Sequence, residues 1–167
     1  MPRQLNFRFA AVLLVFVGLV WLTYREAVLG AMIAPLTEIT AHITTAMLDL
    51  CGMEAVRSLT VVSHPDGFAF EIYYRCTGIL PAAFLAVSIF AYPGALRKKL
   101  CAIAMGLPLL MALNLIRLVR LFHIGVHHPA AFGAAHAVVW QALIIFATAG
   151  LWIGWTRWSD ALEEKLS

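Results

Sequence analysis

Residues 76–99 have the sequence CTGILPAAFLAVSIFAYPGALRKK, and this stretch decides the fold class. Its apolar block extends from Cys76 to Leu96 and is followed at once by the cations Arg97, Lys98 and Lys99. A helix rises ~1.5 Å per residue, so a block of this length can cross the ~30 Å hydrocarbon core of a bilayer. Basic residues beside such a block usually stay on the cytoplasmic side. We therefore predict a membrane span with Cys76 at its outer end.

Three further apolar blocks, at residues 9–24, 100–122 and 136–156, indicate that the whole chain is membrane-embedded. Of the 167 residues, 62% are hydrophobic and only 13% are charged, and the mean hydropathy is +0.87. Soluble domains carry about 25% charged residues, so a typical soluble domain is excluded. No linker or low-complexity segment divides the chain. We predict one all-α integral membrane domain over residues 1–167, with about four transmembrane helices.

The first block could be a retained anchor or the apolar core of a cleaved signal peptide. Cleavage needs small residues at the processing site, and the windows 29–31 and 32–34 each place a bulky residue where a small one is needed. We therefore expect an anchor.

The positive charges predict the orientation of the chain. Lys and Arg total 12 against 9 Asp and Glu, and the cations form small clusters between the apolar blocks. Such clusters indicate topology and not a nucleic-acid surface, so no nucleic-acid partner is expected. With both termini cytoplasmic, the inner side carries Arg3, Arg8, Arg97, Lys98, Lys99, Arg157 and Lys165, and the outer side carries Arg25, Arg57, Arg75, Arg117 and Arg120. Two segments, about 25–75 and 123–135, then face outward.

The long outward segment has a structure of its own. Apolar residues recur at helical spacing from Ile33 to Leu50, and this predicts an amphipathic helix that lies on the membrane or against the bundle. Its expected apolar face comprises Ile33, Leu36, Thr40, Ile43, Met47 and Leu50, opposite Glu38, His42, Thr45 and Asp49. Further on, residues 59–62 and 68–73 flank the turn sequence 64–67 and predict a small β-hairpin that leads to Cys76.

Three polar residues converge on the outer membrane boundary. Arg117 lies 17 residues after Leu100, which is about 25 Å along a helix. Cys76 begins the second span from the same side, and His136 begins the fourth. A charge deep in the bilayer costs at least ~2.5 kcal/mol, so an arginine there calls for an explanation.

Each of the three residues also has a structural interpretation. Cys76 could be an apolar filler, or it could form a disulfide with Cys51. Either Arg117 or Arg120 could extend to lipid head groups, and His136 could be purely structural. Together, however, they form a set suited to acyl transfer. A helix N-terminus and a guanidinium would lower the pKa of the Cys76 thiol, and His136 would exchange protons. Backbone N–H groups near Thr77 and Gly78, together with Arg117, would hold an oxyanion.

At these residues the sequence resembles the exosortase/archaeosortase family of membrane transpeptidases. The matching blocks are Cys76-Thr77-Gly78, Asn114-Leu115-Ile116-Arg117 and His136, in the family's order and each at the outer end of an apolar block. The resemblance covers about residues 74–150. It implies that Cys76 is the nucleophile, Arg117 its thiolate or oxyanion partner and His136 the general acid/base, with Thr77, Gly78 and Asn114 in support. Arg120, one turn further on, stays open as an alternative arginine.

The resemblance also implies a substrate and a location. The family cleaves C-terminal sorting tags of exported proteins, each made of a short signature, a transmembrane helix and a basic cluster, and passes the acyl group to an acceptor. The chain lacks the extra N-terminal spans of many members and is similar to the compact exosortase H subtype, whose tags resemble Ile-Pro-Thr-Leu. Expected partners are the tag helix, membrane lipid and an acyl acceptor, without a cofactor. The expected location is the bacterial cytoplasmic membrane with the site facing outward, and either one chain or a homo-oligomer encloses the substrate.

Other functions fit the sequence less well. A quinone-linked disulfide oxidoreductase needs paired cysteines, and Cys51, Cys76 and Cys101 contain no C-x-x-C motif. Haem or metal binding would use His123, His127, His128 and His136, but no H-E-x-x-H motif is present. Ser88 lies in the middle of an apolar block and lacks the G-x-S-x-G motif that would indicate a serine protease. The main alternative is a non-catalytic membrane scaffold or assembly protein with a structural cysteine.

Overall fold

The computed structural model describes residues 14, 17–18 and 26–164, with side chains for 14, 17–18 and 33–161. The predicted first span, residues 9–24, therefore lies outside the described residues apart from Leu14, Val17 and Gly18. The elements are α2 (Glu26–Leu50), β1 (Val56–Ser58), β2 (Val61–Ser63), β3 (Ala69–Glu71), the 3₁₀ turn η1 (Tyr74–Cys76), α3 (Ile79–Ala91), α4 (Leu96–His127), α5 (Pro129–Ala134), the π-helical turn η2 (Ala135–Val139) and α6 (Trp140–Glu164).

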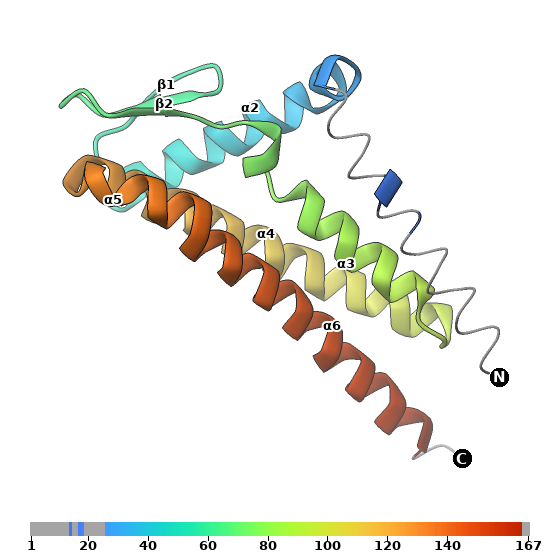
Figure 1. Cartoon of the computed structure of the whole chain (residues 1–167). Coiled ribbons are helices and arrows are strands. Elements are labelled where there is room, and N and C mark those ends of the chain that lie inside the picture. The colour runs from blue at the N-terminus through green and yellow to red at the C-terminus, as the bar shows by residue number, and fades with distance from the viewer. Residues whose placement is uncertain (1–13, 15–16, 19–25, 165–167) are drawn as a thin grey trace.

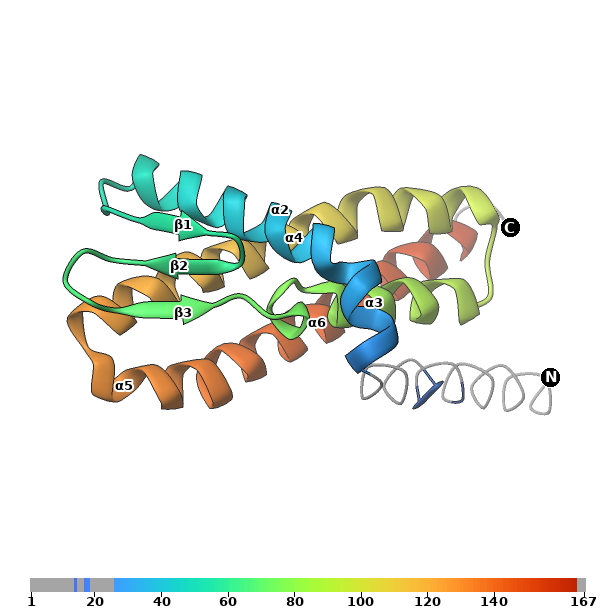
Figure 2. The ribbon, with the colours of Figure 1, turned by 90° about the horizontal axis from the view of Figure 1, so that it is seen from above.

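Helices α3, α4 and α6 lie side by side as an elongated bundle (Figures 1 and 2). The sheet, α2 and α5 gather at one end of this bundle. The turn between α3 and α4 and the C-terminal end of α6 lie at the other end. The two ends of the bundle are therefore built from different elements, with apolar helices between them.

Two helical segments among the described residues are long and apolar enough to cross a membrane. They are Leu96–His127 with 32 residues and Pro129–Ala161 with 33 residues. Helix α3 is apolar but has only 13 residues, or about 20 Å at ~1.5 Å per residue. The described residues therefore contain two helical segments that could each cross a membrane, with the shorter apolar helix α3 packed beside them in the bundle.

The observed helices differ from the predicted spans at several ends. Helix α3 ends at Ala91 and not at Leu96, because Pro93 disfavours helical backbone in the residue before it. Helix α4 begins at Leu96, so the basic cluster lies in its first turn. The last helical segment begins at Pro129, seven residues before the predicted start, because proline suits the first position of a helix.

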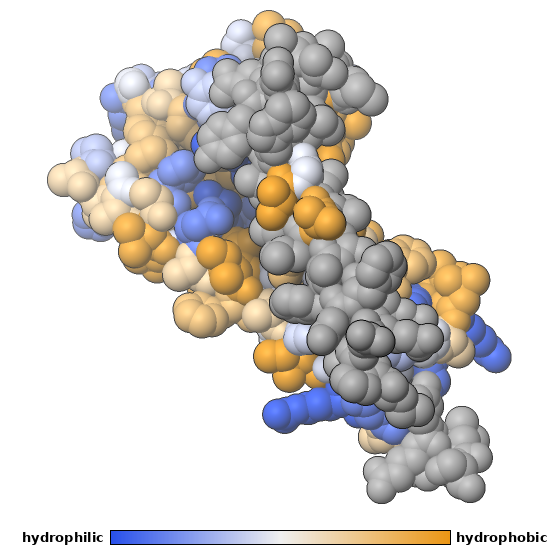
Figure 3. Space-filling view, turned by 45° about the vertical axis from the view of Figure 1, so that its right-hand side comes forward, coloured by the Kyte–Doolittle hydropathy of each residue, from blue (hydrophilic) through white to orange (hydrophobic). Residues whose placement is uncertain are grey.

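Polar contacts tie α3, α4 and α6 together at the end away from the sheet. The Tyr92 hydroxyl lies 2.8 and 2.9 Å from the two carboxylate oxygens of Asp160, and Lys98 Nζ donates to the Ser159 carbonyl at 3.1 Å. Next to them, Leu85, Ile89, Ala102, Leu110 and Trp155 form a buried apolar cluster. On the face in Figure 3, hydrophilic side chains gather near the two ends and hydrophobic ones lie between them.

Helix α2 confirms the helix predicted from Ile33 to Leu50, and its buried face shares Ile33 and Thr40 with the predicted apolar face but otherwise differs from it. The side chains that it buries are Ile33, Thr37, Thr40, Ala41, Thr44 and Leu48, whereas Leu36, Ile43 and Leu50 are exposed. Threonines can be buried here because their hydroxyls donate to the carbonyls four residues earlier, as Thr44 does to Thr40 at 2.7 Å. Small side chains let α2 lie close to α4 and η1.

The predicted hairpin is also present, as part of a three-stranded sheet. Strands β2 and β3 are antiparallel with Val62 opposite Phe70, and the turn between them includes Gly67 at φ 99°. Strand β1 pairs with β2 and was not predicted, because its three residues are exposed and show no alternation. The sheet leads through Ile72, which is buried, directly into η1.

Candidate functional site

Cys76 lies in η1, between the sheet and α3, and is only 6% exposed. It belongs to a buried cluster of Ala41, Leu48, Val62, Ile72, Leu118, Val119 and Phe122. The prediction that Cys76 begins the second helix is wrong, because α3 begins at Ile79 and Gly78 precedes it in a left-handed conformation. The thiol is therefore held by a turn packed into the core.

Asn114 of α4 fixes this turn from the side. Its Nδ2 donates to the Cys76 carbonyl at 2.7 Å, and the bond is buried. Gly78 has φ 77°, and a Cβ there would lie 3.0 Å from both Asn114 Cγ and Met111 Cε. Left-handed backbone and close approach both favour glycine. The Cys-x-Gly block and Asn114 thus form one packed unit.

His136 approaches Cys76 from η2, the turn that precedes α6. The distance between Cys76 Sγ and His136 Nε2 is 3.9 Å. This is long for a hydrogen bond, but pairs of catalytic groups are often loose without substrate. His136 lies in the π-helical turn η2, and such turns occur frequently at functional sites. The pair is therefore close enough for proton exchange after a small movement.

An aromatic group orients the histidine ring. Phe132 of α5 stacks on His136 with a centroid distance of 5.8 Å and an interplanar angle of 11°. Phe132 in turn contacts Phe68 and Phe70 at centroid distances of 5.4 and 6.3 Å. Through these contacts the sheet positions His136 relative to Cys76.

Arg117 is the arginine at this site, and Arg120 is not part of it. Arg117 is 4% exposed and lies within electrostatic range of both Cys76 and His136. Arg120 is exposed. Among the described residues, neither Arg117 Nε nor Asn114 Oδ1 has a hydrogen-bond partner. Buried polar atoms are rarely left unpaired, so these two atoms are unsatisfied polar groups of the site.

Burial raises the pKa of the Cys76 thiol above its usual value. A backbone hydrogen bond involving Tyr73 and the positive charge of Arg117 lower this pKa, but desolvation outweighs them. The sequence predicted the opposite, a thiol activated by a helix N-terminus. That prediction fails because η1 buries the sulfur three residues before α3 begins.

The expected oxyanion donors are only partly available. The Thr77 N–H donates to the Tyr74 carbonyl at 3.2 Å, and the Thr77 hydroxyl donates to the same oxygen at 2.6 Å. Thr77 therefore shapes the turn and has no free N–H. The first N–H groups of α3 have no acceptors within their own helix. These N–H groups and the Arg117 guanidinium, whose charge acts on Cys76, are the remaining candidate oxyanion donors.

The other cysteines and histidines do not join this site. Cys51, Cys76 and Cys101 are all free thiols, so the pairing of Cys51 with Cys76 does not occur in this structure. The rings of His123 and His127 lie 4.4 Å apart on α4. Across the described part of the chain, no group of three or more His, Cys, Asp or Glu residues is placed to hold a metal ion.

Sequence reasoning missed two residues of the site, Phe132 and Met111. Phe132 precedes His136 by four residues, a spacing at which helical side chains meet, so the stacking was detectable. Met111 precedes Asn114 by three residues, but only the fold shows that both approach Gly78.

Comparison with known proteins identifies a family. No curated protein and no solved structure matches the chain. The model of the transmembrane exosortase family matches residues 3–154, which is most of the chain and includes Cys76, Arg117 and His136. The chain therefore belongs to the transmembrane exosortase family.

Proposed function

We propose that this protein is a membrane cysteine transpeptidase that cleaves C-terminal sorting tags from exported proteins. Cys76 serves as the nucleophile, His136 as the general acid/base, and Arg117 as the partner of the developing negative charge. The approach of Cys76 Sγ to His136 Nε2, 3.9 Å apart beside buried Arg117, is the observation that carries the proposal. Family membership supports the reaction class.

The reaction proceeds through a thioester. His136 takes the thiol proton as Cys76 Sγ attacks the carbonyl carbon of the scissile peptide bond. Arg117 and the N–H groups at the start of α3 stabilise the resulting oxyanion. When the C–N bond breaks, His136 returns the proton to the leaving amine. An acceptor nucleophile then attacks the thioester, transfers its proton to His136 and releases Cys76, which regains a proton.

The raised pKa of Cys76 fits this order of events. A thiol that is neutral at rest needs a base next to it when the substrate arrives, and His136 is such a base. A neutral resting thiol is also less open to oxidation outside the cytoplasm.

The substrate and location follow from the same proposal. The substrate is an exported protein whose tag joins a short signature such as Ile-Pro-Thr-Leu to a transmembrane helix and a basic cluster. The protein resides in the bacterial cytoplasmic membrane with both termini inside. Cys76 and the sheet face the periplasm or the exterior, while Arg97 and its neighbours face the cytoplasm. We assign the chain to the compact exosortase H subtype.

The test is processing of an exported reporter that carries such a tag, coexpressed with the protein. Cys76→Ala, Arg117→Ala and His136→Ala should each abolish cleavage, while the variant proteins still accumulate in the membrane. Arg117→Lys should fail to restore cleavage if the forked guanidinium is required. Arg120→Ala and Cys51→Ala are the matched controls and should cleave normally. Normal processing by Cys76→Ala would favour a scaffold with a structural cysteine.

A further inference from the structure

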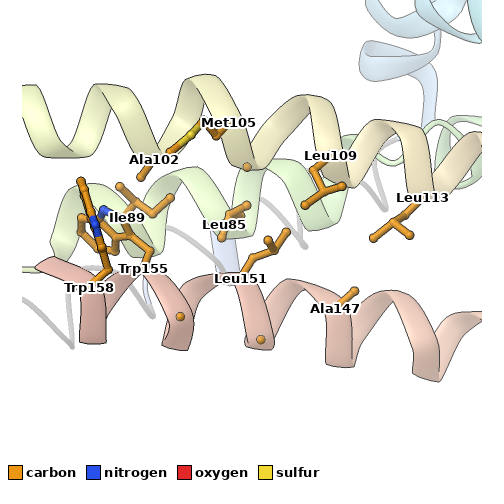
Figure 4. A pocket seen from close by; sticks show the side chains of 13 residues that line it. Leu85, Ile89, Ala102, Met105, Leu109, Leu113, Ala147, Leu151, Trp155 and Trp158 are labelled. Atoms are coloured by element: carbon orange, nitrogen blue, oxygen red, sulfur yellow. The ribbon is translucent and has the colours of Figure 1, made fainter.

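Two histidines lie against each other at the C-terminal end of α4, next to α5. The ring centroids of His123 and His127 are 4.4 Å apart, with an angle of 55° between the ring planes. His123 is half-buried and His127 is exposed, so the pair can be reached from solvent. It lies ten residues, or about 15 Å, beyond Leu113, where the α4 lining of the apolar groove between α3, α4 and α6 ends (Figure 4). The histidine pair is therefore separate from that groove.

The spacing of the two histidines is one at which a helix can chelate an ion. Residues four apart lie one above the other on a helix, with ~5–6 Å between their Cβ atoms. Two imidazole nitrogens that bind one Zn²⁺ at ~2.0–2.1 Å each lie about 3 Å from one another. Rings whose centroids are 4.4 Å apart can meet this requirement after a small side-chain rotation, because the nitrogens are at the ring edges. One ion can thus bind both rings without a change in the backbone of α4.

The two rings have no other polar partner in the described part of the chain. Neither ring makes a hydrogen bond or an ion pair there, whereas His64 contacts Asp66 at 3.4 Å. A neutral imidazole has one nitrogen with a free lone pair, and this nitrogen can bind a metal ion. The lone pairs of His123 and His127 are therefore not committed to another donor among the described residues.

The charges around the pair act in opposite directions on a bound cation. His127 is the last residue of α4, where the helix dipole places a partial negative charge that attracts cations. The positive charge of Arg120 is within electrostatic range of His123 and opposes a second cation. Because Arg120 is exposed, water and salt screen its charge. The surroundings of the pair thus weaken the binding of a cation without excluding it.

We propose that His123 and His127 form a two-ligand site for a divalent transition-metal ion that prefers imidazole, Cu²⁺ or Zn²⁺. By contrast, Mg²⁺ and Ca²⁺ prefer oxygen ligands. No third His, Cys, Asp or Glu within the described ranges completes the group, so water takes the other positions on the ion. A bound ion joins the last two turns of α4, directly before α5, and stabilises the folded protein. The site does not depend on the proposed reaction.

The binding test titrates Cu²⁺ into the purified full-length protein in detergent. Serine replaces Cys51, Cys76 and Cys101, and the purification tag contains no histidine, so that neither a thiol nor the tag competes for the ion. We expect one tightly bound Cu²⁺ per chain, with an electron paramagnetic resonance spectrum that shows coupling to two ring nitrogens. Added Zn²⁺ should displace Cu²⁺ from the site, and added Mg²⁺ should not.

The variants separate metal binding from simple ring stacking. His123→Phe and His127→Phe each keep an aromatic ring and remove a ligand. Each should weaken Cu²⁺ binding at least tenfold, because two ligands on one rigid helix hold the ion at a high effective concentration. His128→Phe is the matched control and should bind as the parent does, since His128 follows α4 with non-helical backbone. Arg120→Ala should tighten binding about twofold to fivefold, because it removes a like charge.

Thermal unfolding gives a second measurement that needs no spectrum. Saturating Zn²⁺ should raise the unfolding midpoint of the parent and leave that of His127→Phe unchanged. Equal Cu²⁺ affinity in the parent and both ligand variants, a spectrum without two nitrogens, or the absence of saturable binding would overturn the site. An equal loss in His128→Phe would overturn the assignment of the two ligands. Reporter cleavage enters none of these measurements, so failure of the proposed reaction leaves their outcome unchanged.

Discussion

At the scale of single residues, the nucleophile candidate is protected by its surroundings. Cys76 is buried among apolar side chains, and the opposing effect of Arg117 does not offset the cost of a buried thiolate. The resting form is therefore the thiol. Reactivity then depends on His136 and on the bound substrate, and not on a permanently ionised sulfur.

The first prediction concerns the pH dependence of alkylation. In a Cys51→Ser/Cys101→Ser background, labelling of Cys76 by a small maleimide should increase with pH and reach its midpoint above that of an exposed thiol, because burial raises its pKa. Arg117→Ala should move the midpoint further upward, since it removes a cation that favours the thiolate. Arg120→Ala should leave it unchanged. Rapid labelling at neutral pH would contradict the raised pKa.

The second prediction concerns Gly78. Gly78→Ala should cost about 1–3 kcal/mol from the left-handed backbone, and more from contact with Asn114 and Met111. Gly52→Ala is the matched control, because Gly52 has φ 74° and open space around it. The unfolding midpoint of the purified protein in detergent measures both variants. Equal losses would mean that the neighbours of Gly78 move aside without cost.

At the scale of elements, the helices bring distant residues together and the turns set their directions. Helix α4 carries Asn114 and Arg117 three residues apart, so one rigid helix both fixes the turn of Cys76 and places a cation beside it. The π-helical turn η2 holds His136 on the opposite side. The sheet reaches this turn through Phe132.

The third prediction tests the link between the sheet and the histidine. Phe132→Ala should lower reporter cleavage about tenfold to a hundredfold by misplacing the His136 ring, because misplacement by about 1 Å can cost this much. Phe132→Tyr should retain most of the activity, since it keeps the stacked ring. Phe90→Ala, at an exposed position on α3, should have little effect. Unchanged cleavage and an unchanged pH profile in Phe132→Ala would show that the stacking is not needed.

The sequence predicts these elements better than their contacts. Apolar blocks predicted the helices, and the turn at 64–67 predicted the pairing of β2 with β3, because both signals are local. The buried face of α2 was mispredicted because threonines satisfy their hydroxyls within the helix and can then be buried. The stacking of Phe132 on His136 follows a helical spacing and could have been predicted. The position of Cys76 before α3 and the approach of Met111 to Gly78 depend on tertiary packing, which no residue spacing encodes.

At the scale of the whole molecule, the chain separates polar groups to opposite ends. The sheet and α2 lie at one end (Figure 1), and the contacts of Tyr92 with Asp160 and of Lys98 with Ser159 join α3, α4 and α6 at the other. With the apolar helices between them, this arrangement fits a protein that acts on one side of a membrane and is anchored by charge on the other.

The fourth prediction tests this orientation with cysteine labelling in intact cells. Cys51 is exposed beside the sheet, and a membrane-impermeant maleimide should label it from outside. Ala95→Cys, at the exposed turn before α4, should react only after the cells are permeabilised. Both are measured with the other cysteines replaced by serine. The reverse pattern would place the catalytic centre in the cytoplasm.

The burial of Cys76 within a core cluster has a consequence for genetics. Leu118 and Phe122 are completely buried in the same cluster as the thiol. Truncation of such side chains usually costs 2–5 kcal/mol. Under the proposed function, a random screen for loss of tag processing would recover these positions together with Cys76, although their side chains carry no reactive group. Measuring protein abundance for each hit would distinguish substitutions that lower the amount of folded protein from substitutions that lower its activity.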